Sequence, residues 1–418
     1  MRHIYSFFMY LLTPFLLLRL WWKGRKLPGY RARIAERFCL DALPEARYDI
    51  WVHAVSLGEV IAATPLINQL LAKDYTILVT TMTPTGAERV KNQYGGRVSH
   101  RYVPYDLPVV LTRFFKANQI RVGVIVETEL WPNLIDKASK ASIPLLLVNA
   151  RLSERSCKGY EKIRWLIKPV LNQFQGILAQ AADDAERFRH LGAESARVTV
   201  LGNVKFDLET RNIDKPFFEQ IKQAWGDERM AVIAASTHDN EEQQILTGFR
   251  QLRAEVPDAV LLIAPRHPER FQLVYQLACQ MGFNTALRSQ AETISTASEV
   301  IVLDCLGEML GFYHVSNYAF VGGSFVSVGG HNVLEPIAMN TPVFSGPNIH
   351  NFKTICQDLQ QAQAIEMVAN AEDLMQRIIK LRNDKEAREK LVANASQVLD
   401  SNKGAVARYI ARIESVIM

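Results

Sequence analysis

The sequence predicts an α/β protein made of two doubly wound, Rossmann-like domains, preceded by an apolar anchor segment. The first observation is size, because 418 residues with 48% hydrophobic content are too many for one core and divide naturally into two domains of roughly 180 to 200 residues. The second is an alternation of short apolar runs with amphipathic helical segments, which is typical of parallel sheets covered on both faces. The third is the strongly apolar N-terminus.

The N-terminal segment is the first element. Residues 4–18 are nearly all apolar, and Arg19-Leu20-Trp21-Trp22-Lys23-Gly24-Arg25-Lys26 follows them without a small-residue cleavage site, so we expect an uncleaved anchor over residues 1–26. Arg19 leaves a short apolar core for a span of about 20 residues, whereas the Trp pair and basic cluster suit the headgroup region. An anchor that spans the bilayer and one that lies in one leaflet both stay open, and a buried first helix of a soluble domain is the remaining alternative. The Lys/Arg excess places the body of the protein in the cytoplasm.

Apolar runs then predict the strands of two sheets. In the first domain these are residues 50–55, 76–80, 122–126, 144–148, 176–179 and 198–201. After a polar connector over 207–215, the second set comprises residues 231–235, 259–264, 300–303, 318–321 and 342–344. A final helix over about 387–418 is expected to return to the first domain. Ligands of such sheets bind beyond the carboxyl ends of the strands, so we expect two facing domains with a cleft between them.

Composition narrows the class of function. The net charge of +5 is mild, which gives no reason to expect a nucleic-acid partner. The five cysteines are scattered and form no Cys-x-x-Cys pair, which fits reduced thiols in a cytoplasmic protein. The chain also lacks Asp-x-Asp, His-Glu-x-x-His and Gly-x-x-x-x-Gly-Lys-Ser/Thr motifs. We therefore expect neither a metal-chelated diphosphate nor an NTP hydrolase.

Carboxylates follow two strands of the first domain. Ser56-Leu57-Gly58-Glu59 comes directly after the strand over 50–55, and a glutamate at such a turn can act as a general base toward an acceptor hydroxyl. The alternative is that Glu59 only complements the dipole of the helix that begins there. Glu127 and Glu129 follow the strand over 122–126. Two acids this close repel each other where solvent is limited, and spacing alone does not say which is structural and which functional.

A glycine-rich stretch in the second domain has the layout of an anion-binding loop. The strand over 318–321 breaks into Gly322-Gly323-Ser324, whose glycines would let backbone amides approach a ligand, and Asn332 and Glu335 lie where a helix would begin. Glu335 would either complete a capping box or accept hydrogen bonds from a ribose. The alternative is a glycine-rich turn capped for stability.

Three other strand ends of the second domain also suit a phosphorylated ligand. Pro265-Arg266 offers a guanidinium that can bind phosphate bidentately. Ser236-Thr237-His238 offers a hydroxyl and an imidazole, and Leu306-Gly307-Glu308 offers a backbone approach point. The second domain thus gathers phosphate-type features while the first gathers carboxylates. This asymmetry suggests a donor in one half and an acceptor in the other.

These motifs, taken in order along the whole chain, resemble those of the Kdo transferases, which attach 3-deoxy-D-manno-octulosonic acid (Kdo) to the lipid A precursor of Gram-negative outer membranes. The resemblance implies a GT-B glycosyltransferase of lipopolysaccharide synthesis that uses CMP-Kdo as donor and lipid IVA as acceptor. It also implies contact with lipids of the inner membrane and work on its cytoplasmic side. The motifs that carry it are the apolar start with Arg19-Leu20-Trp21, then Ser56 to Glu59, Thr80 to Gly86, Glu127 to Asn133, Asn149 to Ser153, Lys205 to Asp207, Pro265 to Arg270, Gly322 to Ser324 and Gly329 to Glu335.

The resemblance also implies roles for single residues. Glu59 matches the general base of an inverting single displacement, and Glu129 and Lys205 match positions that stabilise the transition state. No metal or other cofactor is implied. Val333 and Leu306 stand where some relatives carry proline and methionine, and neither difference alters a charge. The residues that match the CMP-binding segments are Pro265, Arg266, Leu306, Gly307, Glu308, Asn332, Val333, Leu334 and Glu335.

The expected domain plan and its rivals follow from this. We expect the anchor over 1–26, an acceptor-binding domain over 27–206, a nucleotide-sugar domain over 207–395, and a C-terminal helix over 396–418 that returns to the first domain. One alternative is another GT-B enzyme, such as a sialyl- or N-acetylglucosaminyltransferase or a nucleotide-sugar epimerase, because this fold serves many chemistries. The other is a non-catalytic, membrane-tethered scaffold that binds lipid.

Overall fold

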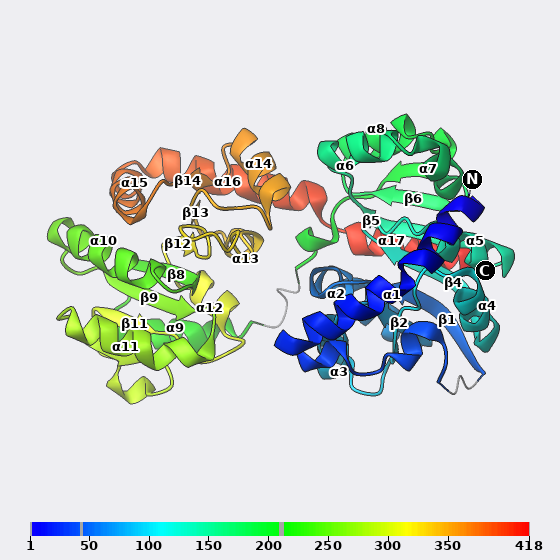
Figure 1. The fold of residues 1–418 in the computed structure, drawn as a ribbon. Coiled ribbons are helices and arrows are strands. Elements are labelled where there is room, and N and C mark those ends of the chain that lie inside the picture. The colour runs from blue at the N-terminus through cyan, green and yellow to red at the C-terminus, as the bar shows by residue number, and fades with distance from the viewer. Residues whose placement is uncertain (1, 42–44, 209–212, 418) are drawn as a thin grey trace. The chain divides into compact units, whose positions relative to one another are not determined.

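The computed structural model describes residues 2–41, 45–208 and 213–417, which form two compact units (Figure 1). Unit 1 comprises residues 1–207 and 403–418, and unit 2 comprises residues 208–402. Each unit holds one seven-stranded sheet with helices on both faces. All strand pairs in both sheets are parallel. The predicted fold class, two doubly wound α/β domains after an apolar helix, is confirmed.

The sheet of unit 1 has the strand order β3-β2-β1-β4-β5-β6-β7. Its strands are β1 (Ala46–His53), β2 (Ile77–Thr81), β3 (Ser99–Tyr102), β4 (Asn118–Val126), β5 (Leu145–Ala150), β6 (Gly176–Ala179) and β7 (Val198–Val200). Its helices are α1 (Arg2–Lys26), α2 (Leu57–Leu71), α3 (Pro84–Tyr94), α4 (Pro108–Ala117), α5 (Pro132–Lys140), α6 (Glu154–Glu161), α7 (Arg164–Leu171), α8 (Ala182–His190) and α17 (Ala405–Ile417), with 3-10 turns at Pro28–Tyr30, Ala35–Phe38, Ser195–Arg197 and Val204–Phe206.

Alternate side chains of each strand in unit 1 enter one of two apolar cores. Along β1, Ile50 and Val52 pack with α2, α3 and α17, whereas Trp51 packs with α4, α5, α7 and α8. This is the two-residue period of a strand with both faces covered. It explains why the central strands are apolar throughout, as the sequence pattern predicted.

The sheet of unit 2 has the strand order β10-β11-β9-β8-β12-β13-β14. Its strands are β8 (Ala231–Thr237), β9 (Val260–Pro265), β10 (Thr285–Leu287), β11 (Val300–Val302), β12 (Tyr318–Val321), β13 (Val343–Ser345) and β14 (Glu366–Met367). Its helices are α9 (Lys215–Trp225), α10 (Glu241–Glu255), α11 (Phe271–Gln280), α12 (Met309–His314), α13 (Leu334–Ala338), α14 (Lys353–Gln361), α15 (Ala371–Asn383) and α16 (Lys385–Asn402), with 3-10 turns at Pro268–Arg270 and Ala291–Thr293.

Helix α1 lies along unit 1 through one side and exposes the other. The Ser6 hydroxyl donates to Asn133 Oδ1 at 2.8 Å, and Arg2 forms an ion pair with Asp136, so two turns of α1 are tied to α5. Leu20 is buried in the unit 1 core. Large apolar side chains on the other side stay exposed, among them Phe7, Phe8, Leu11, Phe15, Leu18 and Trp22. Among the described helices, α1 alone is long and apolar enough to cross a membrane, by length and composition.

The C-terminal part of the chain forms two helices where the sequence predicted one. Helix α16 ends at Asn402 and α17 begins at Ala405. Between them Gly404 has φ of +78°, a left-handed conformation that interrupts a helix and favours glycine. The Asp207 carboxylate accepts hydrogen bonds from the amides of Gly404 and Val406 at 2.6 Å each, and thereby caps α17. The prediction of one continuous helix over 387–418 is therefore wrong.

Candidate active site

In each unit the candidate residues follow the strands where the direction of the sheet order reverses. In unit 1 the chain proceeds from β1 to β2 and β3 on one side, and then returns to place β4 on the other side of β1. Glu59 follows β1, and Glu127 and Glu129 follow β4. Ligands of doubly wound sheets bind at such switch points, beyond the carboxyl ends of the strands. The fold therefore brings the predicted carboxylates of unit 1 to one edge of the sheet.

Glu59 closes a capping box at the start of α2. The Ser56 hydroxyl donates to Glu59 Oε1 at 2.9 Å and accepts the amide hydrogen of Glu59 at 3.3 Å, while Glu59 Oε2 accepts from the Val55 amide at 2.7 Å. This reciprocal arrangement satisfies amides at the helix N-terminus, so the structural alternative considered for Glu59 is real. Capping does not exclude a second role for Glu59, because the negative charges of Glu127 and Glu129 also act on its carboxylate.

The environment of Glu59 favours its neutral form. Only 8% of the residue is exposed. Burial, followed by the negative charge of Glu129, raises the pKa of Glu59 to about 8, and the hydrogen bonds from Val55 and Ser56 oppose that shift only in part. A carboxylate with a pKa near the working pH accepts a proton far better than one with an ordinary pKa. Glu59 thus caps α2 and has a raised pKa.

The loop after β4 is held in a strained and well-supported conformation. Glu127 has φ of +60°, which is unusual for a residue with a Cβ. The Thr128 hydroxyl donates to the carbonyl oxygen of Arg151, which links this loop to the one after β5. Trp131 Nε1 donates to Glu129 Oε2 at 2.5 Å. Burial raises the pKa of Glu129, while the bond from Trp131 opposes that change.

His53 contacts Trp131 of this loop. It was not predicted as a site residue. Its ring contacts Trp131 edge to face, with centroids 5.3 Å apart. Its Nδ1 lies 3.0 Å from the Thr80 hydroxyl, and its Nε2 is buried without a hydrogen-bond partner. Burial lowers the pKa of His53 to about 3, so the imidazole stays neutral. We infer that His53 positions Trp131 and, through it, Glu129.

Lys205 lies in the short turn after β7 and shares the electrostatic surroundings of the carboxylates. The Lys205 amide donates to Asn203 Oδ1 at 3.0 Å, and the Val204 amide donates to Asn149 Oδ1 at 3.3 Å. Burial lowers the pKa of Lys205, and the negative charge of Glu127 acts against that shift. The structure therefore places Lys205 near Glu127, while Glu127 and Glu129 both act on Glu59.

The glycine turn after β12 does not present free amides to a ligand. The amides of Gly323, Ser324 and Phe325 donate to the carboxylate of Glu241 at 2.7, 3.0 and 2.8 Å, and the His238 amide does so at 2.9 Å. Glu241 is fully buried. The prediction that these amides approach an anion is wrong, because an internal carboxylate already occupies the position. The contact between Glu241 and Gly323 joins residues that are 82 positions apart, and no local sequence pattern predicts it.

The residues expected to bind a nucleotide lie beyond the carboxyl ends of β9, β11 and β12. Arg266 follows β9 with an exposed side chain, and its amide donates to the Thr237 carbonyl at 2.9 Å. Asn332 Nδ2 donates to Glu335 Oε1 at 3.1 Å. Burial raises the pKa of Glu335, which the Asn332 hydrogen bond and the charge of Arg266 oppose. Arg266 and Glu335 thus interact, while Val333 and Leu334 are buried beneath them.

Two details modify the expected roles in this part of unit 2. Helix α13 has only five residues, so a strong helix end there is not available to bind an anion. The Thr237 hydroxyl is fully buried and lies 3.3 Å from Glu242, which removes it from the candidate phosphate contacts.

The turn after β11 offers one exposed apolar side chain and one fixed carboxylate. Leu306 is 76% exposed, and Gly307 has φ of +88°. Arg288 Nη2 donates to Glu308 Oε1 at 3.0 Å, whereas Glu308 Oε2 is buried without a partner. Arg288, which the sequence did not indicate, therefore holds Glu308 in place.

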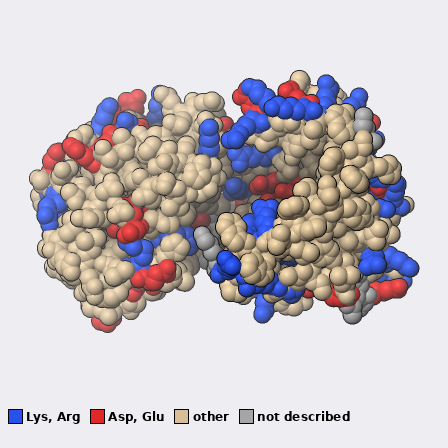
Figure 2. All heavy atoms as spheres, viewed as in Figure 1, with Lys and Arg blue, Asp and Glu red and all other residues tan. Residues whose placement is uncertain are grey.

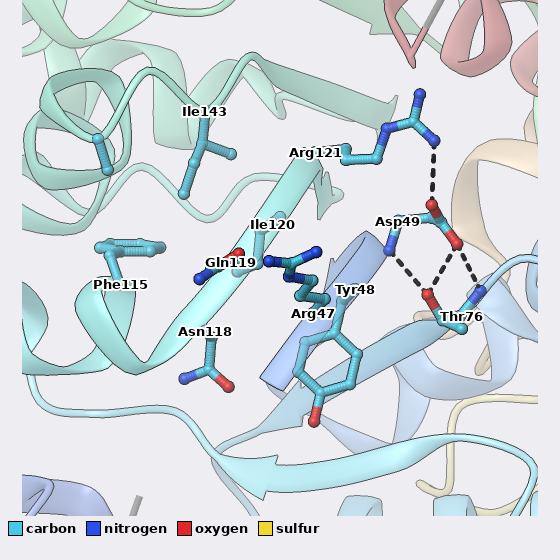
Figure 3. Close-up of a pocket in the computed structure, with 11 residues that line it drawn as sticks. Arg47, Tyr48, Asp49, Thr76, Phe115, Asn118, Gln119, Ile120, Arg121 and Ile143 are labelled. Carbon is cyan, nitrogen blue, oxygen red and sulfur yellow. Dashed lines mark hydrogen bonds and ion pairs between the residues drawn. The ribbon is translucent and has the colours of Figure 1, made fainter. Parts of the chain in front are cut away.

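A separate pocket of about 450 Å³ lies far from these residues (Figure 3). It is at the amino-terminal end of β4, where Asn118 and Arg121 line it, and it includes the loop position Thr76. Asp49 there bonds to Arg121 at 3.1 Å and to the Thr76 hydroxyl at 2.7 Å. Since substrates of doubly wound sheets bind at the opposite edge, we do not assign the reaction to this pocket.

The two switch-point sheets and their polar loops define a protein of the GT-B type. A putative UDP-N-acetylglucosamine 2-epimerase from Listeria monocytogenes has a similar fold, with a TM-score of 0.56 and 15% identity, over 88% of this chain and 96% of that one. Residues 32–208 match the family model for 3-deoxy-D-manno-octulosonic-acid transferase (kdotransferase).

Sequence relatives identify the family. The 3-deoxy-D-manno-octulosonic acid transferase of Haemophilus influenzae is 39% identical over 415 residues, which cover 98% of this chain and 97% of that protein. The same transferase of Bordetella pertussis is 30% identical over 429 residues, 99% of each chain. The chain therefore belongs to the Kdo transferase family of glycosyltransferases, and the resemblance seen in its motifs is confirmed.

Proposed function

We propose that this protein transfers Kdo from CMP-Kdo to lipid IVA by a single displacement that inverts the anomeric centre. Glu59 is the general base and no metal takes part. The observation that carries this proposal is the Glu59 carboxylate, which lies at the switch point of unit 1 with a pKa raised to about 8. Membership of the Kdo transferase family supplies the sugar that is transferred.

The reaction balances as one concerted exchange. Glu59 accepts the proton of the acceptor hydroxyl, and the oxygen forms a bond to the anomeric carbon of Kdo. The bond from that carbon to the phosphate oxygen breaks, and its electron pair leaves with CMP. Because entering and leaving oxygens occupy opposite faces of the carbon, the configuration inverts.

Glu129 and Lys205 would stabilise charge during this exchange. A carboxylate held by Trp131 at 2.5 Å is preorganised to face the positive charge that develops on the sugar ring. The half-buried Lys205 carries the opposite charge and would act on the carboxylate or phosphate of the donor. Burial lowers the pKa of Lys205, and the negative charge of Glu127 opposes that shift and so favours the protonated form.

The donor nucleotide would bind at the strand ends of unit 2. Arg266 is the exposed cation among the predicted residues and suits the phosphate. Asn332 and Glu335 present paired polar groups for the cytidine or its ribose. Pro265, Leu306, Gly307, Glu308, Val333 and Leu334 would complete this site. Side-chain cations, in place of a metal, would then neutralise the leaving group.

Helix α1 would hold the enzyme on the cytoplasmic side of the inner membrane. Its polar contacts to α5 leave an outward apolar side, over which Figure 2 shows few charged side chains. A helix with one side docked on a protein and the other apolar suits insertion into one leaflet. We therefore propose the in-leaflet arrangement over the spanning one. The inner membrane also holds the lipid acceptor.

Product mass spectrometry tests the proposed function. The purified protein is given lipid IVA, a CMP-Kdo-generating system and EDTA, and the acceptor should gain one or more Kdo units. Glu59→Gln should lower the transfer rate by about 10²–10⁴-fold. Ser56→Ala tests the loss of the cap alone, at about 1 kcal/mol of stability. It keeps the carboxylate but loses a hydrogen bond that lowers the pKa of Glu59, so at a pH above that pKa it should keep most of the transfer that Glu59→Gln loses.

Each failure of this test points to a different conclusion. An unmodified acceptor alongside an active reference transferase would reject this donor and acceptor pair. Transfer from another nucleotide sugar would favour the other GT-B activities, and no transfer with retained vesicle binding would favour the scaffold. Full activity of Glu59→Gln would remove the base assignment but not the family.

A further inference from the structure

Two histidines in unit 2 form a pair that none of the assigned roles uses. His238 follows β8, and His331 lies in the loop after β12, the strand that neighbours β8 in the sheet. Their Nε2 atoms are 2.8 Å apart, and their ring planes differ by 2°. A hydrogen bond between two ring nitrogens requires that one donates and the other accepts. The two imidazoles therefore share one proton across the switch point of unit 2.

Gly323 provides the space for this pair. A Cβ at position 323 would lie 2.9 Å from His331 Cδ2 and 3.4 Å from His238 Cδ2, and the residue has φ of +67°. Gly323, which the sequence predicted to let amides approach a ligand, thus lets the two imidazoles pack against the turn. Both histidines remain partly exposed, so a ligand can reach them.

The charges that face the pair keep it neutral without a ligand. Burial lowers the pKa of His331 to about 4, and His238, Arg266 and His267 add to the shift. Burial also lowers the pKa of His238, with His267, Arg266 and Arg270 acting the same way and Glu242 acting against them. A bound anion at Arg266 would reverse the sign of this field.

We propose that His238 and His331 bind the nucleotide phosphate as a proton-sharing pair, which takes up one proton from solvent when the phosphate binds and returns it when the nucleotide leaves. The product of uptake is one imidazolium hydrogen-bonded to one neutral imidazole, a charge-assisted bond. This inference rests on the proposed function, because the phosphate is that of CMP or CMP-Kdo. It places a second cation beside Arg266 at the leaving group.

The size of the effect follows from linkage. A neighbouring opposite charge moves a pKa by about 1–3 units, which would raise the pKa of His331 from about 4 in the free protein to about 5–7 in the complex. At the upper end of that range, roughly half a proton would be taken up per CMP at pH 7, and more at pH 6. CMP would then bind up to about tenfold more tightly at pH 6 than at pH 8.

Calorimetry of the full chain with CMP measures this uptake directly. Binding enthalpies in buffers of different ionisation enthalpy give the protons taken up at pH 6, 7 and 8, and cytidine provides the comparison without phosphate. His331→Gln and His238→Gln should each abolish most of the uptake. His314→Gln is the matched control, because His314 is also a histidine of unit 2 but pairs with Glu219 at 3.3 Å, apart from the shared hydrogen bond, and this variant should keep the uptake.

The outcomes separate this inference from the proposed function. CMP binding without proton uptake, or uptake in the pair variants equal to that of the wild-type chain, would overturn the inference and leave the donor assignment intact. Uptake that persists in both variants would come from other groups of the protein, because a phosphate that binds beside cations releases protons, and it would overturn the inference. If the wild-type chain does not bind CMP but transfers sugar from another nucleotide, both the donor assignment and this inference fail.

Discussion

Glu59 combines two demands that pull its ionisation in opposite directions. As a cap it accepts hydrogen bonds from Val55 and Ser56, which favour the carboxylate. Burial and the charge of Glu129 favour the neutral acid and prevail, so the pKa rises to about 8. The consequence is a base that is largely protonated below pH 7. Its activity should therefore depend on pH in the range where most enzymes of the cytoplasm work.

We expect the single-turnover rate of Kdo transfer to rise with pH through about 8, because only deprotonated Glu59 accepts the acceptor proton. Glu129→Gln should move the midpoint to lower pH, since the negative charge of Glu129 raises the pKa of Glu59. The readout is the midpoint of rates measured from pH 6 to 9.5, whatever the maximal rate becomes.

Glu154→Gln is the matched control for this pH profile. Glu154 is exposed on α6 and pairs with Lys158 at 2.7 Å, on a different helix from Glu59. The midpoint should stay in place in that variant. An unchanged midpoint in Glu129→Gln would mean that Glu129 does not set the ionisation of Glu59.

Local patterns revealed Glu59 but not Glu241 and Arg288, which hold loops of unit 2 through contacts with distant segments. The run Ser56-Leu57-Gly58-Glu59 predicts a capped helix after a strand, and this is what forms. Glu241 and Arg288 act through contacts to residues 82 and 20 positions away. Such contacts depend on which strand ends the sheet order brings together, and no short motif encodes that order.

At the scale of elements, sequence patterns found the central strands and missed three at sheet edges. Every predicted strand forms, whereas β3, β10 and β14 were not predicted. All three are at the ends of the sheet orders, and β3 carries the polar sequence Ser-His-Arg-Tyr. Edge strands are short and half solvated, so they lack the continuous apolar run that marks a strand buried on both faces.

The glycine turn after β12 makes a prediction at this scale. Glu241→Gln should lower the free energy of unfolding by about 1–3 kcal/mol, because an amide nitrogen would replace one acceptor oxygen facing buried N–H donors. Chemical denaturation monitored by circular dichroism measures this. Glu255→Gln, exposed at the end of the same α10, should leave the midpoint unchanged. Equal stability of the two variants would show that Glu241 does not hold the turn.

At the scale of the whole molecule, the proposed contact with the membrane depends on how α1 is held on unit 1. A helix that spans the bilayer would have to leave the surface of unit 1 and break the Ser6–Asn133 hydrogen bond and the Arg2–Asp136 ion pair. These two contacts hold the N-terminal end of α1, and the buried Leu20 holds its C-terminal part. Both ends of α1 are therefore tied to unit 1. The helix can then enter the membrane only from the side, through its exposed apolar residues.

The position of the N-terminus distinguishes the two arrangements. With α1 in one leaflet, an N-terminal epitope tag should be digested by protease in inverted inner-membrane vesicles and protected in right-side-out vesicles, on the same side as a C-terminal tag. With a spanning helix the two tags should lie on opposite sides. Asn133→Ala together with Asp136→Ala removes the polar docking, and Lys158→Ala on exposed α6 is the control. If the wild-type tags lie on opposite sides, the contacts of α1 with α5 do not persist in the membrane, and the in-leaflet arrangement is wrong.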